Sequence, residues 1–229
     1  MVNDWGQSRN LNNDVGICSY FKDNLPKEAL LILNQNLVCN YYKRGQFVFY
    51  EGNFPSGLYT VDSGVILLET EGSSGSSHIL DVIQKGGVLG YHSLFADTPY
   101  ESSALVHEDA SLSFIPKHTV MTLIKMVPEI ALKLLQSVSR QLNASQLRFC
   151  GLSDKTAPER VAEAVCYLKN NYSNQNWTRQ EIAEWASTTP ETVIRVLSIL
   201  EKRGLIKQEG RKIIVTDGKA LVESANFRN

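Results

Sequence analysis

Short apolar runs separated by glycines fill the first half of the chain. The runs occupy 47–50, 58–61, 65–68, 78–83 and 110–115. The glycines fall between them, where tight turns need a positive φ: Gly45, Gly52, Gly57, Gly64, Gly86, Gly87 and Gly90. Several short strands at nearly regular spacing are typical of a β-sandwich or barrel. A helical pattern precedes them at 27–37, and the Gly/Ser stretch at 72–77 predicts a hairpin tip.

The apolar period changes after Pro128. Apolar or small residues then follow one another at alternating spacings of four and three: Ala131, Leu135, Val138, Leu142, Ser145, Phe149 and Leu152. This a/d seam predicts a helix over 128–152, on the order of 36 Å long at about 1.5 Å per residue. A single seam can pack on the chain's own strands or pair with a second copy, and the periodicity alone leaves both open. We expect a hinge at 151–154.

Two capped helices that meet at a tight turn are predicted within 178–206. Thr178 followed by Glu181 is a capping box, in which the hydroxyl and the carboxylate satisfy two otherwise unpaired amides. Thr188 or Thr189 can cap the second helix, which has Pro190 in its first turn. The apolar residues of this second helix recur at helical spacing and are expected to face inward: Val193, Val196, Leu197 and Leu200.

A hairpin pattern follows, with strands at 205–208 and 212–215 around a turn at 209–211. Two helices and a turn followed by a hairpin form a winged helix, and the pattern therefore favours DNA binding. The charge distribution agrees locally. The whole chain has a formal net charge of −1, but the residues from 153 onward hold 12 Lys and Arg against 10 Asp and Glu, a net of +2. The basic residues gather at the second helix and the hairpin: Arg195, Lys202, Arg203, Lys207, Arg211 and Lys212.

Other features exclude whole classes of protein. The first residues are polar and lack the apolar core of a signal peptide, and no run of 18 apolar residues occurs, so we expect a cytoplasmic protein that does not contact a membrane. The cysteines are scattered without CxxC spacing and are expected to be buried and reduced: Cys18, Cys39, Cys150 and Cys166. The histidines show no HxH spacing: His78, His92, His107 and His118. We therefore expect neither a metal site nor a cofactor.

Three segments together resemble the CRP/FNR superfamily of bacterial transcription regulators. They are 42–64, 79–95 (ILDVIQKGGVLGYHSLF) and 178–206 (TRQEIAEWASTTPETVIRVLSILEKRGLI), and the resemblance covers roughly 20–217 in the family's order. It implies an α+β fold with an N-terminal double-stranded β-helix (a jelly-roll-like β-roll), a long dimerisation helix and a C-terminal winged helix-turn-helix. The expected divisions are a polar tail at 1–19, a cyclic-nucleotide-binding-like sensor roll at 20–127, the dimerisation helix at 128–152 and the DNA-binding domain at 153–229.

The resemblance assigns roles to residues at the predicted DNA surface. Glu191 and Arg195 lie one helical turn apart on one face. A carboxylate can accept from a cytosine amino group and a guanidinium can donate twice to guanine, so both are expected to read a G·C pair. A surface salt bridge between them is the alternative. Ile194 stands where related oxygen regulators carry a serine. The residues at positions that touch the phosphate backbone in the family are Arg179, Gln180, Thr189 and Thr192.

The region that binds cyclic nucleotides in some relatives departs from their pattern. Those relatives use a glycine and a glutamate for the ribose and a downstream arginine for the cyclic phosphate. Gly90 keeps the glycine place, but Tyr91 replaces the glutamate, and Tyr100, Glu101 or Ser102 replaces the arginine. We therefore predict that cyclic AMP does not bind in the usual way.

The same residues offer three other interpretations. They can line a pocket for another effector: Gly90, Tyr91, His92, Ser93, Tyr100, Glu101, Ser102 and Ser103. Alternatively, the two tyrosines pack as partly buried aromatic residues and His92 forms a local hydrogen bond. Haem ligation through His78 or His92 is the third.

The resulting prediction is a homodimeric transcription regulator and not an enzyme. Its expected partners are double-stranded DNA with a two-fold symmetric site, a second copy of the chain, RNA polymerase and an unknown small-molecule effector. A signalling scaffold that uses the roll only for protein contacts is one alternative, but it leaves Glu191 and Arg195 unexplained. A cupin-type enzyme is the other, and it would need closely spaced histidines with a carboxylate.

Overall fold

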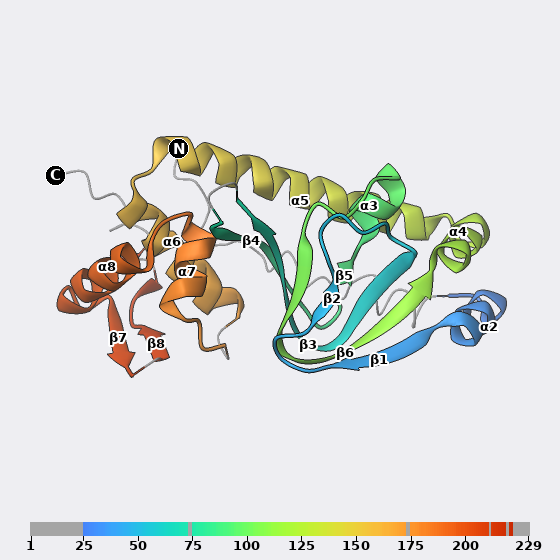
Figure 1. The fold of residues 1–229 in the computed structure, drawn as a ribbon, viewed down its shortest axis with the longest axis horizontal. Coiled ribbons are helices and arrows are strands. Elements are labelled where there is room, and N and C mark those ends of the chain that lie inside the picture. Colours follow the sequence, from blue (N-terminus) through green and yellow to red (C-terminus); the bar gives the residue numbers. More distant parts are fainter. Residues whose placement is uncertain (1–24, 73–74, 173–174, 211, 219, 222–229) are drawn as a thin grey trace. The chain divides into compact units, whose positions relative to one another are not determined.

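A computed structural model describes residues 25–72, 75–172, 175–210, 212–218 and 220–221. The predicted tail at 1–19, Cys18 and Arg211 lie outside these residues. The chain divides into two compact units, which we describe separately. One contains the strands of the N-terminal half and the first part of a long helix, and the other contains the end of that helix and the elements that follow (Figure 1). No helix among the described residues is both long and apolar enough to cross a membrane.

The N-terminal unit is an antiparallel β-roll with the strand order β1-β6-β3-β4. Strand β2 also pairs with β6, and β5 pairs with β3. The strands are β1 (Val38–Tyr42), β2 (Phe47–Phe49), β3 (Gly57–Glu71), β4 (Ser77–Gln84), β5 (Val88–Leu89) and β6 (Ser103–Pro116). The long strands β3 and β6 pair with register shifts between Val61 and Ile66. Such shifts bend and twist a strand pair, which helps the sheet to curl into a roll.

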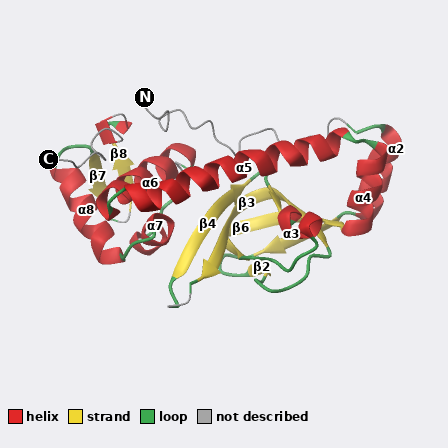
Figure 2. Ribbon diagram, turned by 90° about the horizontal axis from the view of Figure 1, so that it is seen from above, coloured by secondary structure: helices red, strands yellow, loops and turns green. Residues whose placement is uncertain are grey.

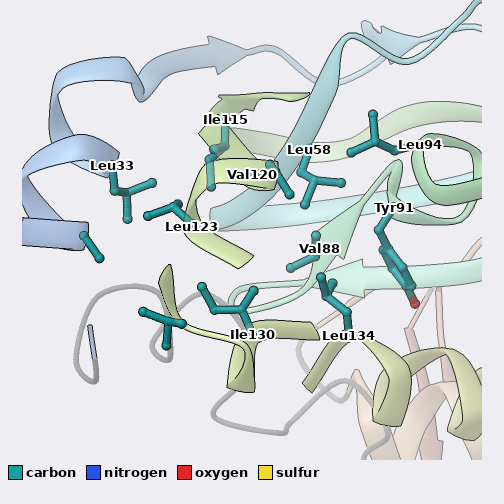
Figure 3. Close-up of a cluster of buried hydrophobic side chains, with 12 residues drawn as sticks. Leu33, Leu58, Val88, Tyr91, Leu94, Ile115, Val120, Leu123, Ile130 and Leu134 are labelled. Carbon is teal, nitrogen blue, oxygen red and sulfur yellow. The ribbon is translucent and has the colours of Figure 1, made fainter. Parts of the chain in front are cut away.

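Helices close one end of the roll around a shared apolar core. They are α2 (Lys27–Asn36), the short α3 (Tyr91–Ala96), α4 (Lys117–Met126) and the start of α5 (Glu129–Asp154). Figure 3 shows Leu33 of α2 and Leu123 of α4 near each other, with Ile130 of α5 in the same cluster. Each of these side chains is at most 1% exposed. Because at least four elements bury apolar side chains here, this core fixes where α3 and α5 lie on the roll.

Helix α5 is 26 residues long and has two apolar sides. Ile130 and Leu134 are buried in the roll core, whereas Leu135, Leu142 and Phe149 of the predicted seam are 60%, 58% and 71% exposed. Ala131, Ser145 and Leu152 are exposed as well, and Val138 is half-buried against the roll core. Packing against the chain's own strands therefore leaves most of the seam exposed.

The hinge expected at 151–154 is wrong, because these residues form the last turn of α5. A single glycine costs a helix only about 1 kcal/mol relative to alanine, and Gly151 is tolerated. The regular structure is interrupted instead at Lys155 and Thr156. Thr156 forms the capping box of the next helix with Glu159, and this new helix start ends the old one.

The C-terminal unit is a winged helix-turn-helix. It consists of α6 (Ala157–Asn171), α7 (Arg179–Ala186), α8 (Pro190–Lys202), β7 (Ile206–Glu209) and β8 (Lys212–Val215). Strands β7 and β8 form an antiparallel hairpin, drawn in yellow beside the red helices in Figure 2. The apolar side of α8 is fully buried, with Val193, Val196, Leu197 and Leu200 each 0% exposed. The predicted fold class is confirmed in both units.

Candidate nucleic-acid interface and effector region

The turn between α7 and α8 is built by caps that the sequence predicted. At the start of α7, the Thr178 amide donates to Glu181 at 2.7 Å, and the Glu181 amide donates to the Thr178 hydroxyl at 3.1 Å. Ser187 ends α7 in the left-handed conformation, with φ of 50°. Thr189 then caps α8, because its hydroxyl accepts from the Thr192 amide at 3.4 Å. Local hydrogen bonds therefore define where both helices start.

One side of α8 is exposed along its length. Glu191, Ile194, Arg195 and Ser198 all lie on it, opposite the buried apolar side. The pKa of Glu191 is lowered, first by its own backbone amide and then by the Thr189 hydroxyl. Its carboxylate is therefore ionised at neutral pH and available as an acceptor, while Arg195 presents donors one turn later on the same side.

The residues predicted to contact phosphates lie around α7 and the start of α8. Arg179 donates to the Gln208 side chain at 2.6 Å and to the Gly210 carbonyl at 3.5 Å, so it ties α7 to the wing. Gln180 is exposed and donates to Glu184 at 2.8 Å. These bonds hold the Arg179 guanidinium between α7 and the wing.

The predicted basic cluster is less positive in the wing than the sequence suggests. Lys207 forms an exposed ion pair with Glu209 at 2.7 Å. The pairing raises the pKa of Lys207 and lowers that of Glu209. Part of the charge at the hairpin is thus neutralised by a neighbour two residues away.

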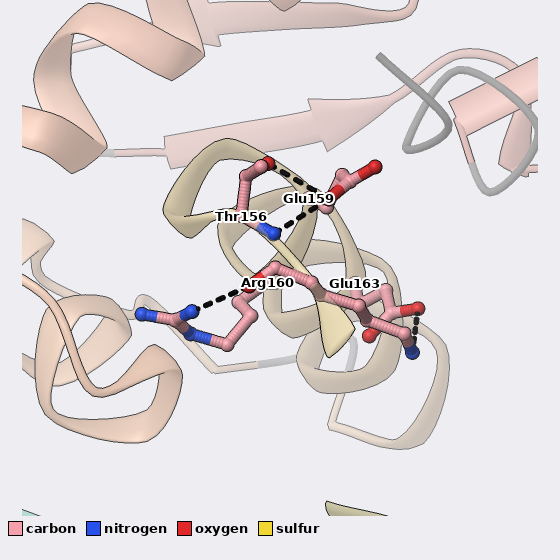
Figure 4. A network of polar contacts seen from close by, with 5 residues as sticks. Thr156, Glu159, Arg160 and Glu163 are labelled. Atoms are coloured by element: carbon pink, nitrogen blue, oxygen red, sulfur yellow. Dashed lines mark hydrogen bonds and ion pairs between the residues drawn. The ribbon is translucent and has the colours of Figure 1, made fainter. Parts of the chain in front are cut away.

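Arg160 of α6 supports the turn, a role that no sequence pattern indicated. Its guanidinium donates to the Ala186 carbonyl at 2.9 Å, to the Ser187 carbonyl at 3.1 Å and to the Lys155 carbonyl at 2.8 Å. The first two carbonyls lie at the C-terminal end of α7, where a cation is favourable because the carbonyl groups there lack helical partners. Figure 4 shows Arg160 beside the capping box of Thr156 and Glu159. One side chain therefore links the end of α5 with the turn before α8.

Arg148, near the end of α5, makes a second link to α7. Its guanidinium carbon lies 4.2 Å from the centre of the Trp185 ring, and it donates to the Trp185 carbonyl at 3.3 Å. Tyr167 stacks on the same indole, with ring centres 5.1 Å apart. These contacts pack the last part of α5 against the first helix of the DNA-binding motif.

In the roll unit, Tyr91 connects α3 with α5. The side chain is only 7% exposed, and its hydroxyl donates to Gln141 at 2.7 Å. Gln141 in turn donates to Asp81 of β4 at 3.1 Å. Burial raises the pKa of Tyr91, and the nearby Asp81 raises it further. The phenol therefore stays protonated and acts as a donor to the long helix.

Tyr100 fills space next to the turn at Gly90. It is 6% exposed and stacks on Phe49, with ring centres 3.8 Å apart. Gly90 has φ of 83°, and a Cβ added there would lie 3.3 Å from the Tyr100 ring. Both tyrosines are thus part of the packed interior of the roll.

The other residues of the predicted pocket differ in their surroundings. The His92 ring lies 4.0 Å from that of Tyr91, and its pKa is lowered by desolvation, although Glu101 and Gln141 act in the opposite direction. Ser93 is buried, Glu101 is exposed, and Ser102 and Ser103 are half-buried. The Ser103 hydroxyl accepts from the Glu51 amide at 3.0 Å. The structure brings Gly90, the two tyrosines and His92 together, and Ser103 faces another segment.

The His, Cys, Asp and Glu side chains of the described ranges bear on the metal-binding and cysteine predictions. No group of three or more His, Cys, Asp or Glu side chains there is arranged to hold a metal ion. Cys166 is buried, and burial raises the pKa of its thiol. The expectation of buried cysteines is wrong for Cys39 and Cys150, which are exposed because they lie on β1 at the sheet edge and on the outer side of α5.

Comparisons with known proteins match both units. The family model of the cyclic nucleotide-binding domain matches residues 39–126, and that of the Crp-like helix-turn-helix domain matches residues 159–224. The chain is 29% identical over 186 residues to the cyclic AMP receptor protein of Thermus thermophilus, covering 80% of this chain and 86% of that protein. It is 26% identical to the CRP-like cAMP-activated global transcriptional regulator of Mycobacterium tuberculosis, covering 86% and 92%.

A solved structure shows the same fold over most of the chain. The structure of FixK2 from Bradyrhizobium japonicum has a TM-score of 0.73 at 22% identity and covers 82% of this chain and 96% of that one. At this identity the likeness bears on the fold alone. The Mycobacterium tuberculosis relative is a regulator of transcription.

Proposed function

Because the chain belongs to the CRP/FNR superfamily of transcription regulators, which bind DNA and act as dimers, we propose that it recognises a two-fold symmetric DNA site through α8. In this proposal Glu191 and Arg195 read one G·C pair in each half-site. The observation that carries the proposal is the exposed side of α8, where an ionised carboxylate and a guanidinium lie one turn apart. Each such base contact contributes roughly 1–3 kcal/mol of discrimination.

Contacts to the phosphate backbone would fix the register of α8 on the duplex. We assign them to Arg179, Gln180, Thr189 and Thr192. Arg179 is held in place by Gln208 of the wing, so its guanidinium is oriented before DNA arrives. Thr189 and Thr192 lie at the N-terminal end of α8, where the helix dipole favours an anion. These contacts supply affinity and not sequence preference.

Dimerisation would bring two copies of α8 into register. The exposed residues Leu135, Leu142 and Phe149 of α5 support this assignment, because a single chain leaves them in water. Two helices paired along this seam would bury them at a two-fold axis. Half-sites about one helical turn of DNA apart, or a multiple of it, would match that symmetry. Double-stranded DNA and RNA polymerase are the partners we propose, and the cytoplasm is where such a regulator would meet them.

We propose that the signal sensed by the roll is not cyclic AMP bound in the usual way. Tyr91 stands where relatives carry a glutamate, and its hydroxyl is already bonded to Gln141 of α5. Tyr100 packs against Phe49 beside Gly90, where no cationic side chain from 100–102 faces a phosphate. An unidentified effector or signal would then act on α5 through the roll.

The proposed DNA contacts are tested by two matched arginine variants. Arg195→Ala should remove a base contact and relax the preference at one G·C pair of each half-site. Arg179→Ala should weaken binding to all sequences alike and lower the salt dependence by about one phosphate per subunit. Selected-site sequencing of each variant at two salt concentrations measures both effects. An unchanged motif for Arg195→Ala together with an altered motif for Arg179→Ala would show that α8 is not the recognition helix.

A further inference from the structure

Ile194 is an exposed apolar residue on the polar side of α8. Its side chain is 54% exposed, although the buried side of the same helix has room for four fully buried apolar residues. At about 100° per residue, Ile194 lies some 60° around the helix axis from Glu191 in one direction. Arg195 lies some 40° from Glu191 in the other direction. The apolar side chain therefore belongs to the surface that we assign to base reading.

The neighbours of Ile194 cannot supply the same kind of contact. Ser198, one turn later, donates its hydroxyl to the Ile194 carbonyl at 3.0 Å, so this hydroxyl is already engaged by the helix itself. Glu191 and Arg195 are charged and pair with polar base edges. Ile194 is the exposed aliphatic side chain of the first two turns of α8. An isolated apolar side chain among charges is a poor surface for an apolar protein partner.

The major groove offers one apolar feature, the 5-methyl group of thymine. We propose that Ile194 packs on the methyl group of a thymine in each half-site, and thereby selects a T·A pair next to the G·C pair read by Glu191 and Arg195. This inference rests on the proposed function and adds one specified base pair to it. Ile194 lies about 4.5 Å beyond Glu191 along the helix axis. In the direction of this axis it is therefore between Glu191 and Arg195, the two base-reading residues.

The size of the effect follows from the single methyl group involved. Moving one methyl group from water into an apolar contact corresponds to about a fourfold change in affinity. A two-fold site with two such contacts should therefore lose affinity by roughly 15-fold when both methyl groups are absent. The hydrogen-bonding edges of the base pair remain the same, so the change reports the apolar contact alone.

Thymine and uracil differ only in this methyl group, which gives a direct test. The full-length dimer is used to select its preferred duplex, and each thymine of the half-sites is then replaced by deoxyuridine, with affinity measured by fluorescence anisotropy. We expect one position at which uracil weakens binding of the wild type by about fourfold per half-site. Ile194→Ala should bind the thymine and uracil duplexes alike, while Ile194→Val should keep most of the difference.

Ile199 provides the matched control, because it is also an exposed isoleucine of α8, at 37%, but lies further from the helix start. Ile199→Ala should retain the preference for thymine. The inference is overturned if the wild type tolerates uracil at every position, or if Ile199→Ala and not Ile194→Ala removes the preference. Either result leaves the proposed function intact, because a selected motif still exists. Failure to select any motif would overturn both.

Discussion

Replacing Arg160 by alanine should loosen the turn between α7 and α8. The substitution removes all three hydrogen bonds from the guanidinium to the carbonyls of Lys155, Ala186 and Ser187. A hydrogen bond from a charged donor contributes about 1.5–3 kcal/mol when it is shielded from water. Arg160 is only half-buried, and water can reach the carbonyls that it leaves, so we expect a total loss of about 2–3 kcal/mol.

The unfolding of the C-terminal unit can be followed by tryptophan fluorescence. Trp177 and Trp185 both lie in this unit, and Trp177 is 1% exposed, so its emission reports loss of the core. For a unit of this size a loss of 2–3 kcal/mol lowers the melting temperature by roughly 10 to 20 °C. Hydrogen exchange should also become faster at the amides of 183–189.

Two further variants separate the geometry of Arg160 from its charge. Arg160→Lys keeps the charge but cannot reach three carbonyls with one ammonium group, so it should recover only part of the loss. Lys202→Ala removes a cation from the exposed end of α8 and should change stability by less than about 0.5 kcal/mol. If Arg160→Ala has the melting temperature of the wild type and hydrogen exchange at the same amides is unchanged, the hydrogen bonds of Arg160 do not stabilise the turn.

Other perturbations test the roll and the long helix. Leu142→Asp should place like charges at the two-fold axis and yield monomers in sedimentation. The control Asn143→Asp, one residue away, should stay dimeric. If Leu142→Asp is dimeric as well, the seam of α5 is not the dimer interface. Tyr91→Phe should lower the free energy of unfolding by about 1 kcal/mol, because Gln141 loses its donor, and an unchanged urea midpoint would contradict this. Millimolar cyclic AMP should not raise the melting temperature. A ligand that does bind adds about 2.7 kcal/mol to the free energy of unfolding at 100 times its dissociation constant, so a clear rise would contradict this prediction.

The elements that the sequence predicted well are those set by local signals. The start of α7 follows from Thr178 and Glu181, which are three residues apart, and the start of α8 follows from Thr189 and Pro190. The long helix was predicted from its seam to within a few residues, because the period of the apolar residues does not depend on what they contact. The hinge was misplaced because α5 continues through Gly151 to Asp154, and the break at Lys155 and Thr156 comes where the capping box of the next helix begins.

The contacts that the sequence could not predict join residues far apart in the chain. Tyr91 and Gln141 are 50 residues apart, and Arg160 lies 26 residues from Ala186. No periodic pattern connects such pairs, since their meeting depends on how whole elements pack. Tyr100 was expected near the effector region, but only the fold reveals that its ring stacks on Phe49.

In the proposed dimer, the exposed side of α5 makes the abundance of the protein itself an input to its activity. Leu135, Leu142 and Phe149 would leave water when two chains meet along this side. The free energy of that burial therefore depends on the concentration of the chain, as in any association by mass action. Well below the dissociation constant of the dimer, doubling the synthesis of the chain raises the number of dimers about fourfold. A two-fold DNA site would then respond more steeply to the rate of synthesis than a site that binds one chain.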